Sequence, residues 1–221
     1  MSRQMPTRFA CHLIAVAVAT AIPVSRASIA AGAGRADLQT ATFAGGCFWS
    51  MVHPFDTLPG VVSVVAGYTG GALARPTYSQ VSSGGTGHAE AVEIRYDPTQ
   101  ISYGALLQVF WHTVDPLDAS GQFCDRGEQY RSEIFYHDSA QLRQAQASET
   151  VAVHRLKVTG AVVTQIVSAG PFYVAEDYHQ EYYKRHAIAY GIYKWGCGRD
   201  KRERQLWGPV PENGGGPATK G

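Results

Sequence analysis

Segments of strand character alternate with segments of helical character along this chain, and this order constrains its fold more than any other feature. The strand-like segments are rich in β-branched and apolar residues and cover 39–44, 61–68, 90–96, 132–136 and 161–167. The segments with helical spacing of apolar residues cover 47–58, 102–111, 138–154 and 175–185. Strands that alternate with helices predict an α/β fold, arranged as a two-layer α/β sandwich.

The composition excludes two classes of protein. Hydrophobic residues make up 45% of the 221 residues and charged residues 17%, which is typical of a globular chain and not of a disordered one. Nineteen basic residues stand against eighteen acidic ones, for a net charge of +1, and we find no basic run. The sequence therefore lacks the electrostatic footprint of a nucleic-acid-binding protein.

The first thirty residues have the layout of a secretory signal peptide. Arg3 and Arg8 precede an apolar stretch at 13–22, and the small residues of 28–30 supply a cleavage site. An apolar stretch of ten residues is too short to span a bilayer, so we expect no stable membrane insertion. The sequence predicts removal of the signal peptide 1–30 and an exported, periplasmic or secreted protein.

The mature chain is predicted to be a single domain, 31–208, followed by a disordered tail, 209–221, that is rich in Gly and Pro. It keeps three cysteines, Cys47, Cys124 and Cys197. An odd number of cysteines in an exported protein indicates at least one thiol outside a static disulfide.

Cys47 is the first candidate for chemistry because it follows Gly45 and Gly46 and precedes two aromatic residues, Phe48 and Trp49. The two glycines permit a sharp turn that places the cysteine at the entrance of a helix. Free amides and the helix dipole at that position favour a thiolate. A small, buried, unreactive cysteine is the alternative that this pattern alone leaves open.

Glu90 is the second candidate, at the start of the strand-like segment 90–96. Alternation puts it on one face with Val92, Ile94 and Tyr96, so its carboxyl is predicted to lie on the apolar side. Loss of hydration disfavours the ionised form, and such a carboxyl can serve as a general acid near neutral pH. A solvated carboxyl at the strand end is the alternative.

The segment 122–132 is the third candidate. It is a polar, glycine-containing stretch before a strand, which suits binding, and Cys124 gives it a possible redox role. Ordinary turn chemistry is the alternative for most of its residues.

Six ordered motifs then identify a resemblance. They are Gly-Cys-Phe-Trp at 46–49, Leu-Pro-Gly-Val at 58–61, Gly-Tyr-Thr-Gly-Gly at 67–71, Pro-Thr-Tyr at 76–78, Thr-Gly-His-Ala-Glu at 86–90 and Gln-Tyr-Arg-Ser at 129–132. With this order and spacing, the chain resembles the A-type peptide-methionine sulfoxide reductases over nearly all of 40–208. The resemblance implies an α/β sandwich with a central mixed sheet, flanking helices and an irregular C-terminal segment.

The resemblance also implies an activity and the residues that carry it. The reaction is thiol-dependent reduction of the S epimer of methionine sulfoxide, free or in proteins, which repairs oxidised proteins. By motif, Cys47 is the nucleophile and Glu90 the acid. The implied substrate-binding residues are Phe48 and Trp49 around the methyl group, and Tyr78, Tyr130 and Asp125 around the sulfoxide oxygen. We read His88 and His179, also in motif positions, as structural or supporting residues.

No metal or organic cofactor is expected for this chemistry. The reductant is expected to be an external dithiol, a thioredoxin-like protein, because an exported compartment has no glutathione pool that keeps thiols reduced. The expected partners are oxidised proteins, free methionine sulfoxide and this reductant, with no nucleic acid. We expect a monomer.

The resolving cysteine is not settled by the sequence. Many relatives carry it in a glycine-rich C-terminal tail, but the tail 209–221 contains no cysteine. Cys197, flanked by glycines and expected beyond the last helix, is the first candidate, and Cys124 the second. A Cys124–Cys197 disulfide, either relaying oxidation away from Cys47 or purely structural, is a third reading. A thiol peroxidase and a non-catalytic exported peptide-binding protein are the alternative functions.

Overall fold

The computed structural model describes residues 37–156 and 162–208. The predicted signal peptide, 1–30, and the predicted tail, 209–221, lie outside the described residues, so both stay predictions, as do the boundaries of the domain at 31 and 208. Within the described part, no helix is long and apolar enough to cross a membrane.

Helices and strands alternate in the first two thirds of the chain, and helices dominate the end. The elements are β1 (Gln39–Gly45), α1 (Phe48–Asp56), β2 (Val61–Thr69), α2 (Tyr78–Ser82), β3 (Ala89–Tyr96), α3 (Tyr103–His112), β4 (Gly121–Gln122), β5 (Asp125–Arg126), the 3-10 turn η1 (Glu128–Tyr130), β6 (Ser132–Tyr136), α4 (Ser139–Leu156), β7 (Gln165–Ser168), β8 (Tyr173–Val174), the 3-10 turn η2 (Asp177–His179), α5 (Tyr182–Arg185), α6 (Ala187–Gly196) and α7 (Arg199–Trp207).

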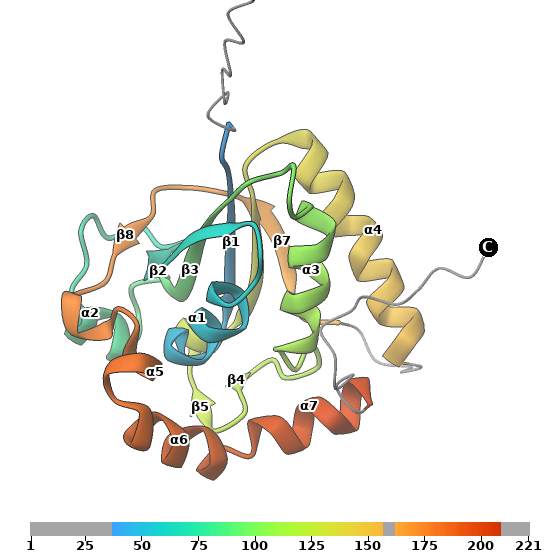
Figure 1. The fold of residues 1–221 in the computed structure, drawn as a ribbon. Helices are drawn as coiled ribbons and strands as arrows, with labels where there is room; N and C mark the ends of the chain where they lie inside the picture. Colours follow the sequence, from blue (N-terminus) through green and yellow to red (C-terminus); the bar gives the residue numbers. More distant parts are fainter. Residues whose placement is uncertain (1–36, 157–161, 209–221) are drawn as a thin grey trace, which may run out of the picture. The chain divides into compact units, whose positions relative to one another are not determined.

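The central element is a six-stranded sheet with the strand order β7-β6-β1-β3-β2-β8 (Figure 1). β6 and β7 run parallel, whereas the other neighbouring strands are antiparallel. The mixed sheet and the α/β class are therefore confirmed. The short hairpin of β4 and β5 lies outside this sheet.

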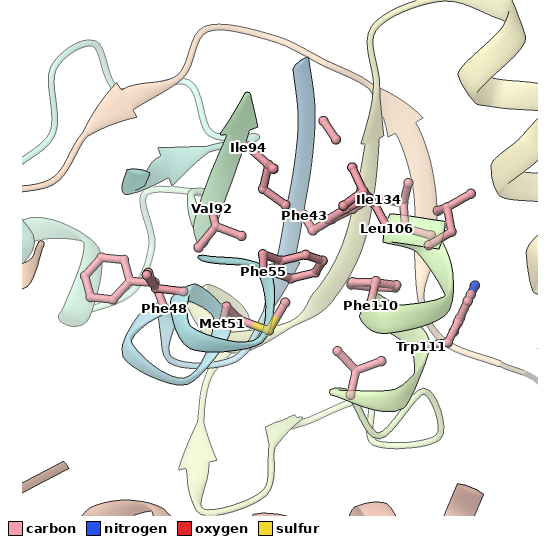
Figure 2. Close-up of a cluster of buried hydrophobic side chains, with 14 of the residues drawn as sticks. Phe43, Phe48, Met51, Phe55, Val92, Ile94, Leu106, Phe110, Trp111 and Ile134 are labelled. Carbon is pink, nitrogen blue, oxygen red and sulfur yellow. The ribbon is translucent and has the colours of Figure 1, made fainter. Parts of the chain in front are cut away.

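One face of the sheet packs against α1, α3 and α4. Phe43 of β1 lies at the centre of this core, with its ring centroid 5.6 Å from Phe55 of α1 and 5.1 Å from Phe110 of α3 (Figure 2). The long helix α4 contributes the small buried side chains Ala145 and Ala152 to the same cluster, and its last residue, Leu156, packs against the cluster while partly buried. These aromatic contacts help to hold α1 and α3 against the sheet by burying apolar area.

The opposite face of the sheet is lined by smaller residues. Ala44, Ala89, Ala91 and Phe135 form a second, smaller cluster there, which is covered in part by Phe172. The two-layer arrangement follows from this difference, because only one face presents a large apolar surface to helices.

Two helix starts agree with the residues that predicted them. The Ser102 side chain accepts a hydrogen bond from Ala105 N at 3.2 Å, which caps α3. Asp138 Oδ1 accepts from Ala140 N at 2.7 Å and from Gln141 N at 2.8 Å, which caps α4. Both caps satisfy amides that a helix start leaves without partners.

The predicted helix at 175–185 is wrong. The chain there forms η2 and the short α5, because the backbone is extended at Gln180 (ψ 134°) and left-handed at Glu181 (φ 51°). The predicted irregular C-terminal segment is also wrong, because α6 and α7 occupy it. The sequence hides α7 because six of its nine residues are charged and no apolar stripe marks it.

Gln180 explains why this segment follows the sheet and not a helical path. Its side-chain carbonyl accepts from Ala66 N, and its side-chain amide donates to Ala66 O and to Ala175 O, all at 2.9 Å. The side chain thus continues the pairing of β8 along the edge of β2. It anchors the segment that carries His179.

We predict that Gln180→Ala lowers the free energy of unfolding by about 1–3 kcal/mol, because it leaves backbone groups of the β2 edge without partners. Thermal or urea unfolding measures this change. The matched control is Gln146→Ala on the exposed side of α4, where the unfolding free energy should stay within about 0.5 kcal/mol of the parent. Equal effects of the two substitutions would contradict an anchoring role for Gln180.

Candidate active site

Cys47 lies at the turn between β1 and α1. Gly46 has φ 87°, a left-handed conformation that suits glycine, and a Cβ there would lie 2.7 Å from Gln122 Cβ. Cys47 is the N-cap residue of α1, is 8% exposed and forms no disulfide. The turn therefore holds a free and nearly buried thiol where strand and helix meet.

Glu90 of β3 reaches the same turn from the sheet. It occupies the face of β3 that also carries Val92, Ile94 and Tyr96, all buried, as the strand alternation predicts. Its Oε2 accepts a hydrogen bond from Phe48 N at 3.0 Å. The carboxyl thus binds the first amide of α1, one residue beyond Cys47.

The environment of Glu90 keeps its carboxyl protonated. Burial raises the pKa of Glu90 from 4.5 to about 8; the Phe48 amide acts in the opposite direction, and Asp125 adds to the rise. A carboxyl with this pKa is neutral at pH 7. It can donate a proton or a strong hydrogen bond to a bound oxygen.

The environment of Cys47 also favours the protonated form. Burial raises the pKa of the Cys47 thiol, and Glu90 and Asp125 raise it further; hydrogen bonds from the Trp49 amide and from Tyr193 are outweighed. The expectation that the start of α1 holds a thiolate is therefore wrong for this structure. The hydration that a buried thiolate loses exceeds what the amides of one short helix return.

Trp49 is held on three sides. Its Nε1 donates to His179 Nδ1 at 3.0 Å, and its ring stacks on Tyr182 with a centroid distance of 3.7 Å and an interplanar angle of 4°. The edge of Tyr193 meets the indole at 6.1 Å and 82°. The indole therefore has one fixed orientation beside Cys47.

The hydrogen bond from Trp49 fixes the tautomer of the neutral His179 ring. Because Nδ1 accepts from Trp49, the neutral ring carries its proton on Nε2. Burial lowers the pKa of His179, and Glu176 acts in the opposite direction. The ring centroid lies 4.9 Å from that of Phe48 and 4.4 Å from that of Tyr78, so His179 is part of the aromatic cluster at the site.

His88 has a different role. Its ring accepts from Gly71 N at 3.1 Å and bonds to Leu73 O at 2.8 Å, which orders the loop after β2. The structural reading of the two motif histidines therefore fits His88, while His179 also shapes the site.

Glu176 ties the tyrosines to the segment after β8. It accepts from Tyr68 Oη and from Tyr78 N, both at 2.9 Å. Burial tends to raise the pKa of Glu176, but these hydrogen bonds outweigh it and lower the pKa below its usual value. Glu176 is ionised at neutral pH and holds the start of α2, and with it Tyr78, against the sheet.

Tyr78 and Tyr130 are half-buried and keep their hydroxyl protons. Burial, followed by the charge of Glu90, raises the pKa of Tyr78 to about 12 and raises that of Tyr130 further. The charges of Cys47 and Asp125 also raise the pKa of both hydroxyls. Both can donate hydrogen bonds.

Asp125 and Tyr193 close the site on the side of the C-terminal helices. Tyr193 Oη donates to Asp125 Oδ2 at 2.5 Å. Burial raises the pKa of Asp125, although this hydrogen bond and the nearby Arg199 act against the rise. The pair joins β5 to α6, elements that are far apart in sequence.

Cys124 and Cys197 form a disulfide. Cys124 is exposed in the turn between β4 and β5, and Cys197 is half-buried at the C-terminal end of α6, between α6 and α7. Cys197 therefore does not lie beyond the last helix, as the sequence analysis expected. The sequence analysis left three possibilities open for Cys124 and Cys197, and the structure contains the third of them, a disulfide between the two. Because the two sulfurs are bonded to each other, the cluster of Cys124, Asp125 and Cys197 offers no thiolate to a metal ion.

Every site residue predicted from the sequence lies in or next to the group of side chains around Cys47, Glu90 and Trp49. Four further residues complete this group: Tyr68, Glu176, Tyr182 and Tyr193. The sequence analysis missed Glu176, Tyr182 and Tyr193 because it assigned 175–185 to one helix and left 186–208 without structure. It placed Tyr68 in a predicted strand and in the Gly-Tyr-Thr-Gly-Gly motif, but gave it no role at the site. The density of aromatic residues in 172–195 is the signal that pointed to this segment.

Comparison with known proteins gives the family. A family model described as peptide methionine sulfoxide reductase matches residues 39–210. The chain is 52% identical to peptide methionine sulfoxide reductase MsrA 2 of Caulobacter vibrioides over 170 residues, which are 77% of this chain and 86% of that protein. It is 48% identical to MsrA of Bacillus subtilis, over 77% of this chain and 96% of that one.

Solved structures agree. Methionine sulfoxide reductase A of Corynebacterium diphtheriae has a TM-score of 0.64 and 33% identity, over 70% of this chain and 78% of that one. Mxr1 of Saccharomyces cerevisiae in reduced form has a TM-score of 0.64 and 29% identity, over 68% and 87%. The chain belongs to the peptide methionine sulfoxide reductase family. It is an oxidoreductase of the A type, as the resemblance implied, and its reaction is thiol-dependent reduction of methionine sulfoxide.

The raised pKa of Glu90 predicts a pH-dependent cost to folding. The carboxyl contributes fully to stability below about pH 4.5 and loses that contribution as the pH rises toward 8, because the unfolded chain releases the proton first. Glu90→Gln removes this titration. Between pH 4.5 and 7, the unfolding free energy of the parent should therefore fall by about 3 kcal/mol relative to that of Glu90→Gln.

Urea unfolding of both proteins at several pH values measures this shift. Glu93→Gln, on the opposite face of the same strand, is the matched control for replacing a carboxyl of β3 by an amide. A constant difference between the parent and Glu90→Gln across this range would contradict a buried, protonated Glu90.

Proposed function

We propose that Cys47 is the nucleophile and Glu90 the acid with which this chain reduces the S epimer of methionine sulfoxide, free or in oxidised proteins. The observation that carries the proposal is the meeting of a free thiol and a protonated carboxyl at the first amide of α1, next to Trp49. A sulfoxide needs this pair, because its oxygen is a poor leaving group until it is protonated.

The first step reduces the substrate and oxidises Cys47. Glu90 gives a proton or a strong hydrogen bond to the sulfoxide oxygen, and the hydroxyls of Tyr78 and Tyr130 add further donors. Cys47 sulfur attacks the sulfoxide sulfur and gives up two electrons. This attack forms a sulfur–sulfur bond, while the protonated sulfoxide oxygen leaves as water. Water then attacks Cys47 sulfur and breaks the sulfur–sulfur bond, which releases methionine, returns one proton to Glu90 and leaves Cys47 as sulfenic acid.

The thiol proton must leave Cys47 as it attacks. The carboxyl of Glu90 is the group that can receive it once its own proton has moved to the substrate oxygen. The raised pKa values of both groups suit such an exchange, because at least one proton then stays on Cys47 or Glu90. The site thus avoids a state with two adjacent negative charges.

Phe48 and Trp49 are proposed to contact the methyl group of the substrate. Aromatic surface attracts a methyl-sulfur group and disfavours a charged side chain. The hydrogen bond from Trp49 to His179 and the stack on Tyr182 fix this surface before substrate arrives. Asp125, held by Tyr193, is proposed to line the site near the oxygen.

The two other cysteines are proposed to return Cys47 to the thiol. The Cys197 thiol condenses with the Cys47 sulfenic acid, which forms a Cys47–Cys197 disulfide and releases water. The Cys124 thiol then attacks Cys197 sulfur, frees the Cys47 thiol and leaves a Cys124–Cys197 disulfide. A free Cys47 beside this disulfide, the pairing of the structure, is the end state of this relay.

The reductant of that disulfide is proposed to be a thioredoxin-like dithiol protein, and the site of action outside the cytoplasm. The layout of residues 1–30 supports export, and an exported protein has no glutathione pool to draw on. No prosthetic group takes part in this scheme.

Incubation with methionine S-sulfoxide and dithiothreitol, followed by assay of methionine, tests the reaction. We predict that Cys47→Ser loses essentially all turnover while its unfolding curve matches the parent. Turnover in that variant would contradict the mechanism and reopen the peptide-binding or peroxidase alternatives.

We predict that Glu90→Gln lowers kcat/KM about 10²–10⁴-fold, the usual loss for a general acid. The parent kcat/KM should fall as the pH rises through about 8, where Glu90 loses its proton. Steady-state assays from pH 6 to 9.5 measure both effects. Parent-like rates in Glu90→Gln at every pH would move the acid role elsewhere.

The relay predicts a stoichiometry without added reductant. Fully reduced parent enzyme should yield about two methionines per chain, one leaving the Cys124–Cys197 disulfide and one leaving oxidised Cys47, whereas Cys197→Ser should yield about one. Cys124→Ser should trap a Cys47–Cys197 disulfide, which peptide mapping detects. Equal yields from the parent and both variants would make the disulfide purely structural.

A further inference from the structure

Arg199, the first residue of α7, is a cation inside the protein. Its side chain is 3% exposed, and its Cζ lies over the Phe123 ring, 4.1 Å from the centroid. Nη1 donates to Thr113 O at 2.7 Å, and Nη2 donates to Gly45 O at 3.4 Å. Its ion pair with Glu203, one turn along α7, is longer, at 3.8 Å. Because a buried charge needs its polar contacts, these partners fix the position of the guanidinium.

The guanidinium borders the turn that holds the free thiol. Gly45 ends β1 and lies two residues before Cys47. A Cβ on Gly46, between these two residues, would lie 3.1 Å from Arg199 Nη2, so the guanidinium packs directly against the turn. Its positive charge also acts against the rise in the pKa of Asp125. Arg199 thus connects the start of α7 to the turn of Cys47.

The same side chain adjoins the segments of the other two cysteines. Phe123, over which the guanidinium lies, directly precedes Cys124 in the turn between β4 and β5. Arg199 itself follows Cys197 by two residues. The three segments that the proposed relay must bring together therefore meet at one guanidinium.

The two helices on either side of Cys197 differ in how firmly they are packed. α6 buries only Tyr190, whereas α7 has a buried side chain at each end, Arg199 and Trp207. Trp207 Nε1 donates to Val114 O at 3.3 Å, which fixes the C-terminal end of α7 beside the carbonyl that Arg199 binds. The start of α7 is therefore held, and the end of α6 opens more readily.

Gly198 joins the two helices in a conformation that suits glycine. Only Cys197 and Gly198 lie between α6 and α7 (Figure 1), and Gly198 has φ 65° and ψ 18°. A Cβ at this position would meet no atom within 4 Å. Because glycine reaches other backbone conformations at little cost, a change at Gly198 can rotate Cys197 relative to α7 without a clash.

We propose that Arg199 is a positioning residue of the relay and fixes the start of α7 against the turn of Cys47. Around this fixed point, Cys197 rotates about Gly198 toward Cys47 and then returns to Cys124. The inference rests on the proposed function, in which Cys197 condenses with the sulfenic acid of Cys47.

The step that Arg199 serves is this condensation. Cys197 sulfur attacks Cys47 sulfur and supplies the two electrons of the new sulfur–sulfur bond. The sulfur–oxygen bond of the sulfenic acid breaks, and its hydroxyl takes the proton of the Cys197 thiol and leaves as water. The guanidinium is proposed to act only by holding the two segments in place, because a displacement of about 1 Å between reacting groups can slow a reaction about 10²-fold.

Arg199→Met tests this role in a single turnover. Reduced protein, freed of reductant, is mixed with one equivalent of methionine S-sulfoxide and stopped at a series of times. Dimedone traps the Cys47 sulfenic acid, peptide mapping measures the Cys47–Cys197 disulfide, and methionine is assayed in the same samples. We expect the sulfenic acid to persist about 10–10²-fold longer in Arg199→Met than in the parent, while the rate of methionine formation changes much less. A general loss of stability would not separate these two steps.

Arg202→Met is the matched control. Arg202 lies three residues after Arg199, and its Nε donates to Asp115 Oδ2 at 2.6 Å. The control therefore removes an arginine that holds α7 to the same loop, 113–115, without a hydrogen bond to the turn of Cys47. The lifetime of the sulfenic acid should match that of the parent. Cys197→Ser gives the lifetime in the absence of the resolving thiol.

Arg199→Lys carries the same comparison if Arg199→Met does not fold. Lysine keeps the positive charge but lacks the planar fork that reaches Thr113 O and Gly45 O together. The sulfenic acid should therefore still outlive that of the parent in Arg199→Lys.

Failure of the proposed function has a separate signature. Reduced parent enzyme would then form no methionine, or Cys197→Ser would form no sulfenic acid on Cys47. With both steps intact, a parent-like lifetime of the sulfenic acid in the folded Arg199 variant would overturn the positioning role. An equally long lifetime in Arg202→Met would overturn it as well and assign the effect to the general packing of α7.

Discussion

The hydrogen bond from the Phe48 amide to Glu90 is the interaction on which the rest of the site depends. It joins the start of α1 to the apolar face of β3, and the covalent chain places Cys47 directly before Phe48. The burial that keeps the carboxyl neutral is the same burial that raises the thiol pKa. One environment therefore sets the protonation of both the proposed acid and the proposed nucleophile, and in the proposed mechanism the reaction must redistribute their two protons.

Cys47 and Glu90 lie on a densely packed part of the fold, whereas the residues that orient Trp49 lie on a part with few buried side chains. Cys47 and Glu90 sit on the core between the sheet and α1, where aromatic rings pack around Phe43. The groups that orient Trp49 come from a segment whose α5 buries no residue and whose α6 buries only Tyr190. Local unfolding costs least in such segments, so the aromatic surroundings of the substrate are the part that opens most readily.

The sequence predicted the sheet and the positions of Cys47 and Glu90 on β1, β3 and α1 because alternation and glycine turns act over a few residues. Strand alternation placed Glu90 on the correct face, and Ser102 and Asp138 marked helix starts by local hydrogen bonds. Sequence reasoning failed where a distant contact decides the backbone. Gln180 binds the edge of β2 across 114 residues, and the hydroxyl of Tyr193 reaches Asp125 across 68. Neither partner is visible from the local pattern.

Tyr193 and Cys197 lie on the same turn of α6, so that a movement of Cys197 also moves Tyr193. The Cys197 amide donates to the Tyr193 carbonyl at 2.9 Å, while the Tyr193 hydroxyl holds Asp125 beside Cys47. In the relay, a Cys197 that travels toward Cys47 pulls on the turn that carries this hydroxyl. The movement that brings Cys197 to Cys47 therefore also displaces Tyr193 and breaks its hydrogen bond to Asp125. In the proposed relay, the enzyme with a Cys47–Cys197 disulfide therefore has an incomplete substrate site until Cys124 releases Cys47.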